Sequence, residues 1–297
     1  MRSSYSFSKY TDNELKVFDN IIQKLDNKCK NETRVEPHFT EESLRYTFES
    51  MSGIKNYSMN ESSYRYKVYH LYKEDINVGF EKDPNREVRI SITDLYIFVL
   101  TNESITQFII NKSSNDATGK TLLRNLLDYE GRNELELNNI NLLLDKDFYL
   151  WLFHTVLNRR DSEDDIIIES IEGYRGGNSN SLAHVTGIGS EVLNLLSTLT
   201  FIFESERINR VKVITKHMSH KFSIDLYQNG NLKISFSEYE GSHDELETFE
   251  SMANIIFDVM LIVLPKLSSI YNNDDWDLDQ FKNIGKDVIE KIQQKIS

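Results

Sequence analysis

The chain has a single cysteine, Cys29, which limits the covalent and metal chemistry open to it. One thiol cannot form a disulfide bond within the chain, and it cannot supply the several thiolates of a zinc-finger site. The N-terminal segment also lacks the apolar stretch of a signal peptide. Both features favour a reducing compartment, so we expect a cytoplasmic protein.

Proline and glycine are also scarce, with 3 and 12 residues among 297. This scarcity excludes collagen-like and linker-like chains. Long hydrophobic runs are missing as well, because the longest one, residues 253–264, has about half the length of a membrane span and contains Asp258. We expect a buried helix there and no membrane association. The 15 tyrosines and 16 phenylalanines instead predict a packed core.

Negative charge dominates, since 47 acidic residues face 34 basic ones and give a net charge of −13. The excess is concentrated in two blocks: residues 126–180 carry 12 acidic and 5 basic groups, and residues 241–297 carry 11 and 5. Residues 181–240 between them are balanced at 6 and 6. Such a chain repels polyanions as a whole. Its many Asn, Lys and Ile residues are typical of AT-rich coding DNA, as in low-GC bacteria and their mobile elements.

In the first half, Thr11-Asp-Asn-Glu14 matches a capping box and predicts a helix from residue 15 to Lys28. Residues 42–51 are expected to form a second, short helix. Runs rich in Tyr, Val, Ile and Phe then predict an antiparallel meander, since the gaps are too short for crossover helices. The expected strands are 64–72, 78–81, 88–92, 95–100 and 106–110, followed by helices at 122–127 and 147–158.

The second half predicts strands at 165–172, 182–185, 209–217, 221–227 and 232–237. Helices are expected at 191–203, at 243–264 with a stop at Pro265, and at 278–296. The charged run 159–165 is the best candidate for a domain boundary. We therefore expect an α+β fold of two modules, residues 1–160 and 161–297, each an antiparallel sheet packed by helices.

The apolar pattern of the predicted strands 221–227 and 232–237 also predicts the turn that joins them. A two-residue Asn229-Gly230 turn would place Leu226 opposite Lys233, on mismatched faces. A three-residue loop from Gln228 to Gly230 places Leu226 opposite Leu232 instead. Because a register slip of one residue would expose every apolar side chain, we expect a type I turn with Gly230 in the left-handed region.

Alternation along these strands also predicts a basic surface. If Phe222, Ile224 and Leu226 face the core, the other side of the sheet carries five cations and Asp225. We call this side the cationic face; its residues are Arg210, Lys212, Lys216, Lys221 and Lys233. It could be an ordinary solvated surface, a docking site for an acidic protein surface, or a binding site for the phosphates of nucleic acid.

Two glycine-containing segments point to anion binding. Gly187-Ile-Gly189-Ser190 stands between a predicted strand and a predicted helix, where backbone N–H groups can face an anion. Arg175 lies in the other segment, residues 173–181. Residues 114–121 also resemble the end of a phosphate-binding loop, but the first glycine of that motif is Ser114 here. We favour the simpler interpretation of these segments, which is a turn and a polar helix-capping loop.

Candidate metal ligands are few. His217 and His220, with Asp225 nearby, would supply too few ligands for zinc, and the carboxylates of residues 274–279 fail the calcium-loop pattern beyond its first positions. The neighbouring Lys28 and Lys30 are expected to lower the pKa of the Cys29 thiol. The sequence therefore predicts no metal site and no cofactor.

Since no catalytic motif is present, the favoured function is a non-catalytic interaction protein, a subunit or adaptor of a bacterial assembly with a role in phage defence or a mobile element. It would have an acidic protein partner, and an oligomer is compatible with it. The alternatives are a nucleic-acid-binding module that uses the cationic face and a divergent enzyme. The residues to examine in an enzyme are Arg175, His184, His217 and His220.

Overall fold

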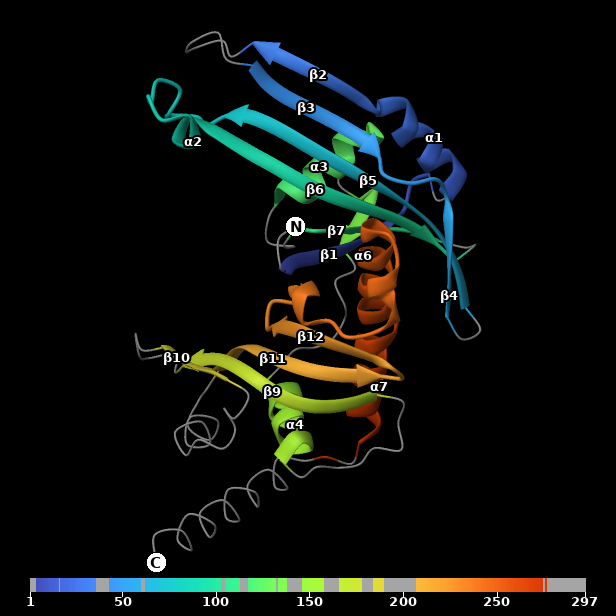
Figure 1. Cartoon of the computed structure of the whole chain (residues 1–297), viewed down its shortest axis with the longest axis vertical. Coiled ribbons are helices and arrows are strands. Elements are labelled where there is room, and N and C mark those ends of the chain that lie inside the picture. The colour runs from blue at the N-terminus through green and yellow to red at the C-terminus, as the bar shows by residue number, and fades with distance from the viewer. Residues whose placement is uncertain are drawn as a thin grey trace, which may run out of the picture. The chain divides into compact units, whose positions relative to one another are not determined.

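The computed structural model in Figure 1 describes most of the chain. The described residues are 4–15, 17–35, 43–59, 62–102, 105–112, 117–131, 133–137, 146–157, 166–177, 184–189, 207–274 and 276. The chain is a sheet-rich α+β protein with antiparallel strands. It divides into two compact units: an N-terminal unit, Phe7–Asn139, and a C-terminal unit that joins Met1–Ser6 to Ile140–Ser297. The charged run 159–165 lies outside the described residues.

The N-terminal unit is a sheet with the strand order β1-β7-β6-β5-β3-β2, to which β8 adds beside β1 and β4 beside β5. The strands are β1 (Ser4–Asp12), β2 (Lys30–Val35), β3 (Ser43–Ser50), β4 (Lys55–Met59), β5 (Ser62–Ile76), β6 (Ile90–Thr101), β7 (Thr106–Ile110) and β8 (Leu135–Leu137). The helices are α1 (Phe18–Lys28), α2 (Arg86–Arg89) and α3 (Ala117–Leu127). Residues 4–6 of β1 belong to the C-terminal unit.

Helices α1 and α3 share one hydrophobic core with this sheet. The apolar side chains that recur along α1 are buried, as their spacing predicts. They join the leucines of α3 and alternate residues of the central strands in one cluster, which includes Phe18, Ile21, Leu25, Leu123, Leu127, Tyr69, Leu71, Ile97, Val99 and Phe108. The predicted meander is confirmed, since β5, β6 and β7 pair in sequence with antiparallel register.

Two predictions of helix structure in this unit were wrong. Residues 42–51 form strand β3, which pairs with β2 and β5. A short run with few apolar residues fits both periods, and the sheet supplies the hydrogen bonds that decide between them. The capping box was wrong too, because Thr11 and Asp12 lie in β1 and the helix begins only at Phe18. The Asp12 carboxylate instead accepts hydrogen bonds from the Glu14 N–H and the Tyr129 hydroxyl.

The connection between β5 and β6 is a turn and not the predicted strand 78–81. Val78 is 92% exposed, so it has no place in a sheet core. The predicted strands 88–92 and 95–100 are parts of one strand, β6, which runs from Ile90 to Thr101, while Val88 belongs to α2. The Asn85 side chain caps α2 by accepting from the Glu87 N–H.

The C-terminal unit contains the sheet β10-β9-β11-β12-β13, followed by β1 in the strand order. Its strands are β9 (Ile166–Gly177), β10 (His184–Ile188), β11 (Arg207–His217), β12 (His220–Tyr227) and β13 (Leu232–Ser235). Its helical segments are α4 (Lys146–Leu157), η2 (Phe236–Glu238), η3 (Ser242–Glu245), α6 (Thr248–Phe257), the π-helical turn η4 (Asp258–Val263) and α7 (Leu264–Asn273). The predicted helices 191–203 and 278–296 lie outside the described residues.

The register of the hairpin between β12 and β13 is the predicted one. Leu226 pairs with Leu232, and Ile224 pairs with Ile234. The Gly230 N–H donates to the Tyr227 carbonyl over 2.9 Å, and Gly230 has a φ of 76°. A left-handed glycine that ends a three-residue loop keeps the apolar side chains of both strands on the core side.

The long apolar helix begins and ends later than predicted. It starts at Thr248, not at His243, and it continues through Pro265 to Asn273. The wide turn η4 directly precedes the proline, and the Leu264 N–H donates five residues back to the Val259 carbonyl. A wider turn relieves the crowding that a proline ring imposes on an α-helix, so the helix continues.

By length and composition, the helix Thr248–Asn273 could span a membrane, and 61% of its most apolar window is buried inside the protein. Core helices of soluble proteins have the same properties. Helix α4 packs on the same unit: the Tyr149 hydroxyl donates to the Leu226 carbonyl over 3.3 Å, and Phe148 contacts Tyr271 of α7 edge to face.

A buried carboxylate in the N-terminal unit supports a testable prediction. Glu74 of β5 is 4% exposed and accepts hydrogen bonds from the Arg45 N–H, the Arg86 guanidinium and the Tyr72 hydroxyl. Burial alone would raise the pKa of Glu74, but the Arg45 N–H and Arg86 together lower it below its ordinary value. The ionised carboxylate is therefore more stable in the folded than in the unfolded chain.

We expect Glu74→Gln to reduce the free energy of unfolding at pH 7 by about 1–3 kcal/mol, because charge-assisted bonds are lost in a buried site. Since the folded pKa is lowered, this contribution is complete above the unfolded pKa and is lost as the pH falls through the folded pKa. Urea unfolding at pH 7 and pH 3 should show the difference shrinking with acid. Glu130→Gln, at an exposed position, is the control; equal losses in both variants would contradict the prediction.

Candidate functional site

The register of β11, β12 and β13 places the five predicted cations on one side of the sheet. Arg210 pairs with Tyr227, Lys212 with Asp225 and Lys216 with Lys221, while Lys233 pairs with Asp225 from the other side. The intervening residues are fully or almost fully buried: Val211, Val213, Thr215, Phe222, Ile224, Leu226, Leu232 and Ile234. Period-two alternation therefore places the five cations on one side, as the sequence predicts, although Ile214 and Ser223 on the same side are also buried.

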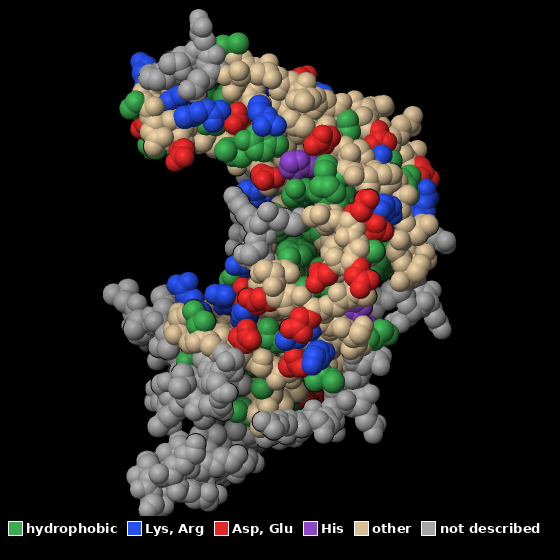
Figure 2. Space-filling view, in the orientation of Figure 1, with side chains coloured by type: hydrophobic (Ala, Val, Ile, Leu, Met, Phe, Trp, Pro, Cys, Tyr) green, Lys and Arg blue, Asp and Glu red, His purple; other side chains and the backbone are tan. Residues whose placement is uncertain are grey.

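The cationic face is neutralised by acidic side chains of the same unit. Arg210 binds Asp225 over 2.6 Å, and Lys221 binds Glu240 over 2.7 Å. Further pairs join Lys212 to Glu172 and Glu238 and Lys216 to Glu169. Figure 2 shows red and blue side chains intermixed over this unit. The alternation of the sequence predicts only one acidic residue here, Asp225, so the cationic face is far less positive than predicted.

The partners also change the titration of these lysines. Burial alone would lower the pKa of Lys212, but Glu238 and Glu172 raise it above its ordinary value. The pKa of Lys221 is raised by its hydrogen bond to Glu240. Each ammonium group is thus held charged by a carboxylate beside it, which leaves little net field to attract a distant polyanion.

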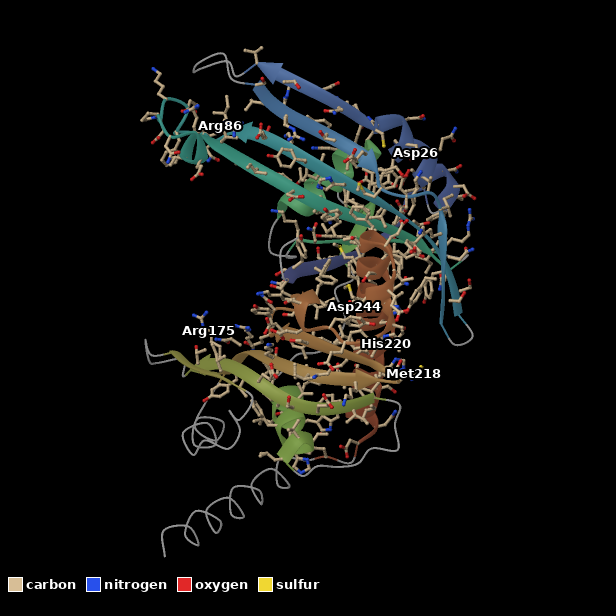
Figure 3. All side chains as sticks on the ribbon, in the orientation of Figure 1. Asp26, Arg86, Arg175, Met218, His220 and Asp244 are labelled. Carbon is tan, nitrogen blue, oxygen red and sulfur yellow. The ribbon has the colours of Figure 1, made fainter. Side chains whose placement is uncertain are left out.

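One end of the sheet is less completely neutralised, although Lys233 still lies near enough to Glu238 to lower the pKa of that carboxyl. Arg175 of β9 is exposed and lies directly opposite Arg210 in the register; it is labelled in Figure 3. Asp225 is already bound by Arg210 and also faces Lys233. Among the residues that the structure describes, neither Arg175 nor Lys233 has an ion-pair partner. Like charges opposite each other on a sheet are unfavourable unless an anion lies between them.

The predicted anion loop is placed only in part. Gly187 lies in β10 opposite Tyr174, and the Gly189 N–H donates to the Glu172 carbonyl over 2.8 Å. Ser190 lies outside the described residues, as does the helix expected after it. Gly173 faces this segment closely, since a methyl group there would lie 3.3 Å from the Gly187 carbonyl oxygen. The described glycines thus serve the pairing of β9 with β10.

The two histidines of the turn after β11 have different surroundings. His217 is 1% exposed, and it pairs with Ile166 of β9 and with His220 in the register. Asp225 lies on the opposite side of the sheet, where it binds Arg210. His217, His220 and Asp225, the candidate ligands considered above, therefore do not surround one point.

His220 instead belongs to a cluster that the sequence analysis did not foresee. We call His220, Tyr239, His243 and Asp258 the histidine cluster. The His243 Nε2 atom lies 2.7 Å from Asp258 Oδ2, and the His220 Nδ1 atom lies 2.5 Å from the Tyr239 hydroxyl. The two imidazole rings stack with their centroids 4.5 Å apart and their planes at 26°. Figure 3 labels His220 at the end of its strand.

Each member is positioned by a different element of the C-terminal unit. His220 begins β12, Tyr239 follows η2, His243 lies in η3, and Asp258 begins η4. Asp258 is 5% exposed within an otherwise apolar stretch of helix. The Tyr239 hydroxyl also accepts from the His243 backbone N–H over 3.3 Å. The His220 side chain and the His243 backbone N–H thus meet at a single tyrosine oxygen.

The cluster perturbs its own titratable groups. The pKa of His220 is lowered by burial and by the neighbouring His243, against the opposing effect of Asp258. Burial raises the pKa of Tyr239 to about 12. At neutral pH, the phenol is therefore protonated, and His220 is biased toward the neutral imidazole.

One signal in the sequence could have found this cluster. Asp258 interrupts an apolar run, and a buried carboxylate requires a partner. The sequence does not name that partner, because His243 was expected to begin the helix that carries Asp258. In the structure, His243 lies in a separate short segment, η3, which places its imidazole beside Asp258 at the start of η4.

The remaining candidates have structural roles in the described residues. Gly119 of the loop resembling a phosphate-binding motif lies in α3, where a methyl group would collide with Ile110. Asp274 accepts a hydrogen bond from the Trp151 indole over 2.9 Å. The expected lowering of the Cys29 pKa was wrong: burial and Asp26 raise it. Of His184, only the backbone position at the start of β10 is described.

Known proteins give no guide to this arrangement, because no family model matches the chain and no curated protein matches it.

The histidine cluster depends on a glycine beside it. A methyl group on Gly241 would lie 2.6 Å from His220 Nδ1 and still closer to the Tyr239 hydroxyl, and Gly241 has a φ of 159°. We expect Gly241→Ala to lower the free energy of unfolding by about 1–3 kcal/mol and to shift the imidazole NMR signals of His220. The control is Gly53→Ala, because a methyl group there meets nothing within 4 Å. Unchanged His220 signals in Gly241→Ala would contradict this packing.

Proposed function

We propose that the protein is a non-catalytic interaction protein, a subunit or adaptor of a cytosolic bacterial assembly, whose partner presents an acidic protein surface. In this proposal, each of its two modules is an antiparallel sheet packed by helices, and the C-terminal module carries the docking site. The composition favours a role in phage defence or in a mobile element. The proposal depends on one observation: at one end of the C-terminal sheet, Arg175 and Lys233 form no ion pair with any residue that the structure describes.

Arg175 and Lys233 are the residues that such a partner would contact. Arg175 is exposed opposite Arg210, and Lys233 is half-buried on the same side of the sheet. The Arg210 guanidinium lies over the Tyr227 ring, 5.8 Å from its centroid. A carboxylate brought in by a partner would relieve the repulsion between the two arginines, and the aromatic ring would add apolar contact.

A protein surface fits this end of the sheet better than nucleic acid does. Binding along a phosphate backbone needs several free cations in a row. Here Lys212, Lys216 and Lys221 are already occupied by glutamates, and the chain has a net charge of −13. A few carboxylates at fixed positions need only the two free cations.

The enzyme alternative has less support. Arg175 lies on the cationic face, whereas His220 lies at the end of its strand on the core side, and His217 is buried. These three side chains therefore do not surround one point at which a substrate could bind.

The docking surface can be tested by charge reversal. Tagged wild-type protein and the variants R175E, K233E and R175E/K233E would be purified from the native host, and the proteins that copurify would be identified. We expect an acidic partner that is retained by wild type and lost by the double variant, with about tenfold weaker binding to the purified partner in each single variant. Binding of the wild type should weaken as salt is raised.

The control is K82E, which reverses an exposed charge in the N-terminal unit and should keep the partner. A partner that binds the double variant as well as wild type would refute the docking surface. Capture of nucleic acid that is lost in the double variant would favour the alternative function.

A further inference from the structure

The histidine cluster brings three metal-ligating side chains together in a single unit. One ligand atom from each of His220, His243 and Asp258 lies within 4.8 Å of the others. Two imidazoles and one carboxylate form a donor set that first-row divalent ions accept, whereas magnesium and calcium prefer oxygen ligands. We propose that His220, His243 and Asp258 form a binding site for Zn²⁺, with the fourth tetrahedral position open.

The contact between His243 and Asp258 is suited to this ion. In the structure, the 2.7 Å separation of Nε2 and Oδ2 is that of a hydrogen bond, so one proton lies between the two atoms. Zinc holds nitrogen and oxygen ligands at about 2.0–2.2 Å. Replacing the shared proton by the ion therefore requires the two atoms to separate by less than about 1 Å. Binding moves this proton away from Nε2, because the nitrogen lone pair must be free to hold the ion.

His220 is oriented by its neighbours so that its other nitrogen can ligate. Its Nδ1 atom contacts the Tyr239 oxygen, which also accepts from the His243 backbone N–H. A proton on Nδ1 leaves the Nε2 lone pair for the metal, and this is the usual way in which a hydrogen-bond partner fixes a ligating histidine. Tyr239 is thus a positioning residue, and Gly241 leaves room for it.

The surroundings distinguish this cluster from an ordinary ion pair on the surface. Asp258 is nearly inaccessible, while His220 and His243 remain partly exposed. An ion can therefore enter from the histidine side and meet a carboxylate with little access to water. The bound ion would link β12, η3 and the start of η4, three segments far apart in the sequence.

The test uses the full chain, freed of tags and treated with a chelator, and titrates it with zinc sulfate by calorimetry. Cobalt(II) chloride serves as a second probe, because its visible absorption reports tetrahedral coordination. We expect one ion per chain and at least about tenfold weaker binding in H220Q, H243Q and D258N, with a smaller loss in Y239F. Saturating zinc should raise the Tm of wild type by about 5–10 °C.

The matched control is H70Q. His70 of the N-terminal unit also contacts a carboxylate, Asp94, at 2.8 Å, but it belongs to no group of three ligands among the described residues. H70Q should bind zinc as wild type does. Folding of each variant is checked by circular dichroism without metal. If H243Q or D258N fails to fold, the zinc affinities of H220Q and Y239F test the proposal. Absence of saturable 1:1 binding in wild type, or equal affinity in H220Q and H70Q, would overturn the proposal.

Discussion

The alternation of side chains along β11 and β12 is the constraint on which the rest of the C-terminal unit depends. Residues on one side fill the core, with Val213 and Ile224 completely buried, and the other side carries the charged residues, with Ile214 and Ser223 buried between them. The same alternation keeps the ion pairs and the histidine cluster on opposite sides of the sheet. Asp225 therefore binds Arg210 on the charged side, and His220 contacts Tyr239 on the core side.

Sequence reasoning succeeded wherever this period-two pattern was reinforced by a turn. The hairpin register followed from matching apolar faces and from the need for a left-handed Gly230. The meander β5-β6-β7 followed from strand-forming residues separated by gaps too short for a helix. The spacing in α1 predicted its buried residues, although the true start at Phe18 depends on β1, which uses Thr11 and Asp12 for pairing.

The sequence did not predict the structure correctly where a residue's hydrogen-bond or ion-pair partners come from segments far away in the chain. Residues 42–51 have a weak pattern, and the neighbouring strands β2 and β5 decide their structure. The acids that neutralise the cationic face come from β9, whose pairing with β11 shifts register at several points, and from the segment after β13. Simple alternation does not predict which side a residue faces beyond such an irregularity. For this reason, the ion pairs of Glu169, Glu172 and Glu238 with the cationic face were not predicted.

The histidine cluster was also not predicted, because its members come from different segments of the chain. Its two histidines are far apart in the sequence, because β12, β13 and η2 lie between His220 and His243. What the sequence does contain is an inconsistency, a carboxylate in an apolar helix. Such inconsistencies are better indicators of a site than motif matches are, because the surrounding fold has to compensate for them.

The π-helical turn that begins at Asp258 also fixes the rotation of the helix on either side of it. One residue advances an α-helix by about 100°, so a turn that holds one extra residue rotates everything beyond it relative to what comes before. Asp258 can face His243 while Leu267, which lies four residues beyond the end of η4 at Val263, remains buried in the core. If this turn were one residue shorter, the helix could not both keep the contact of Asp258 with His243 and bury Leu267.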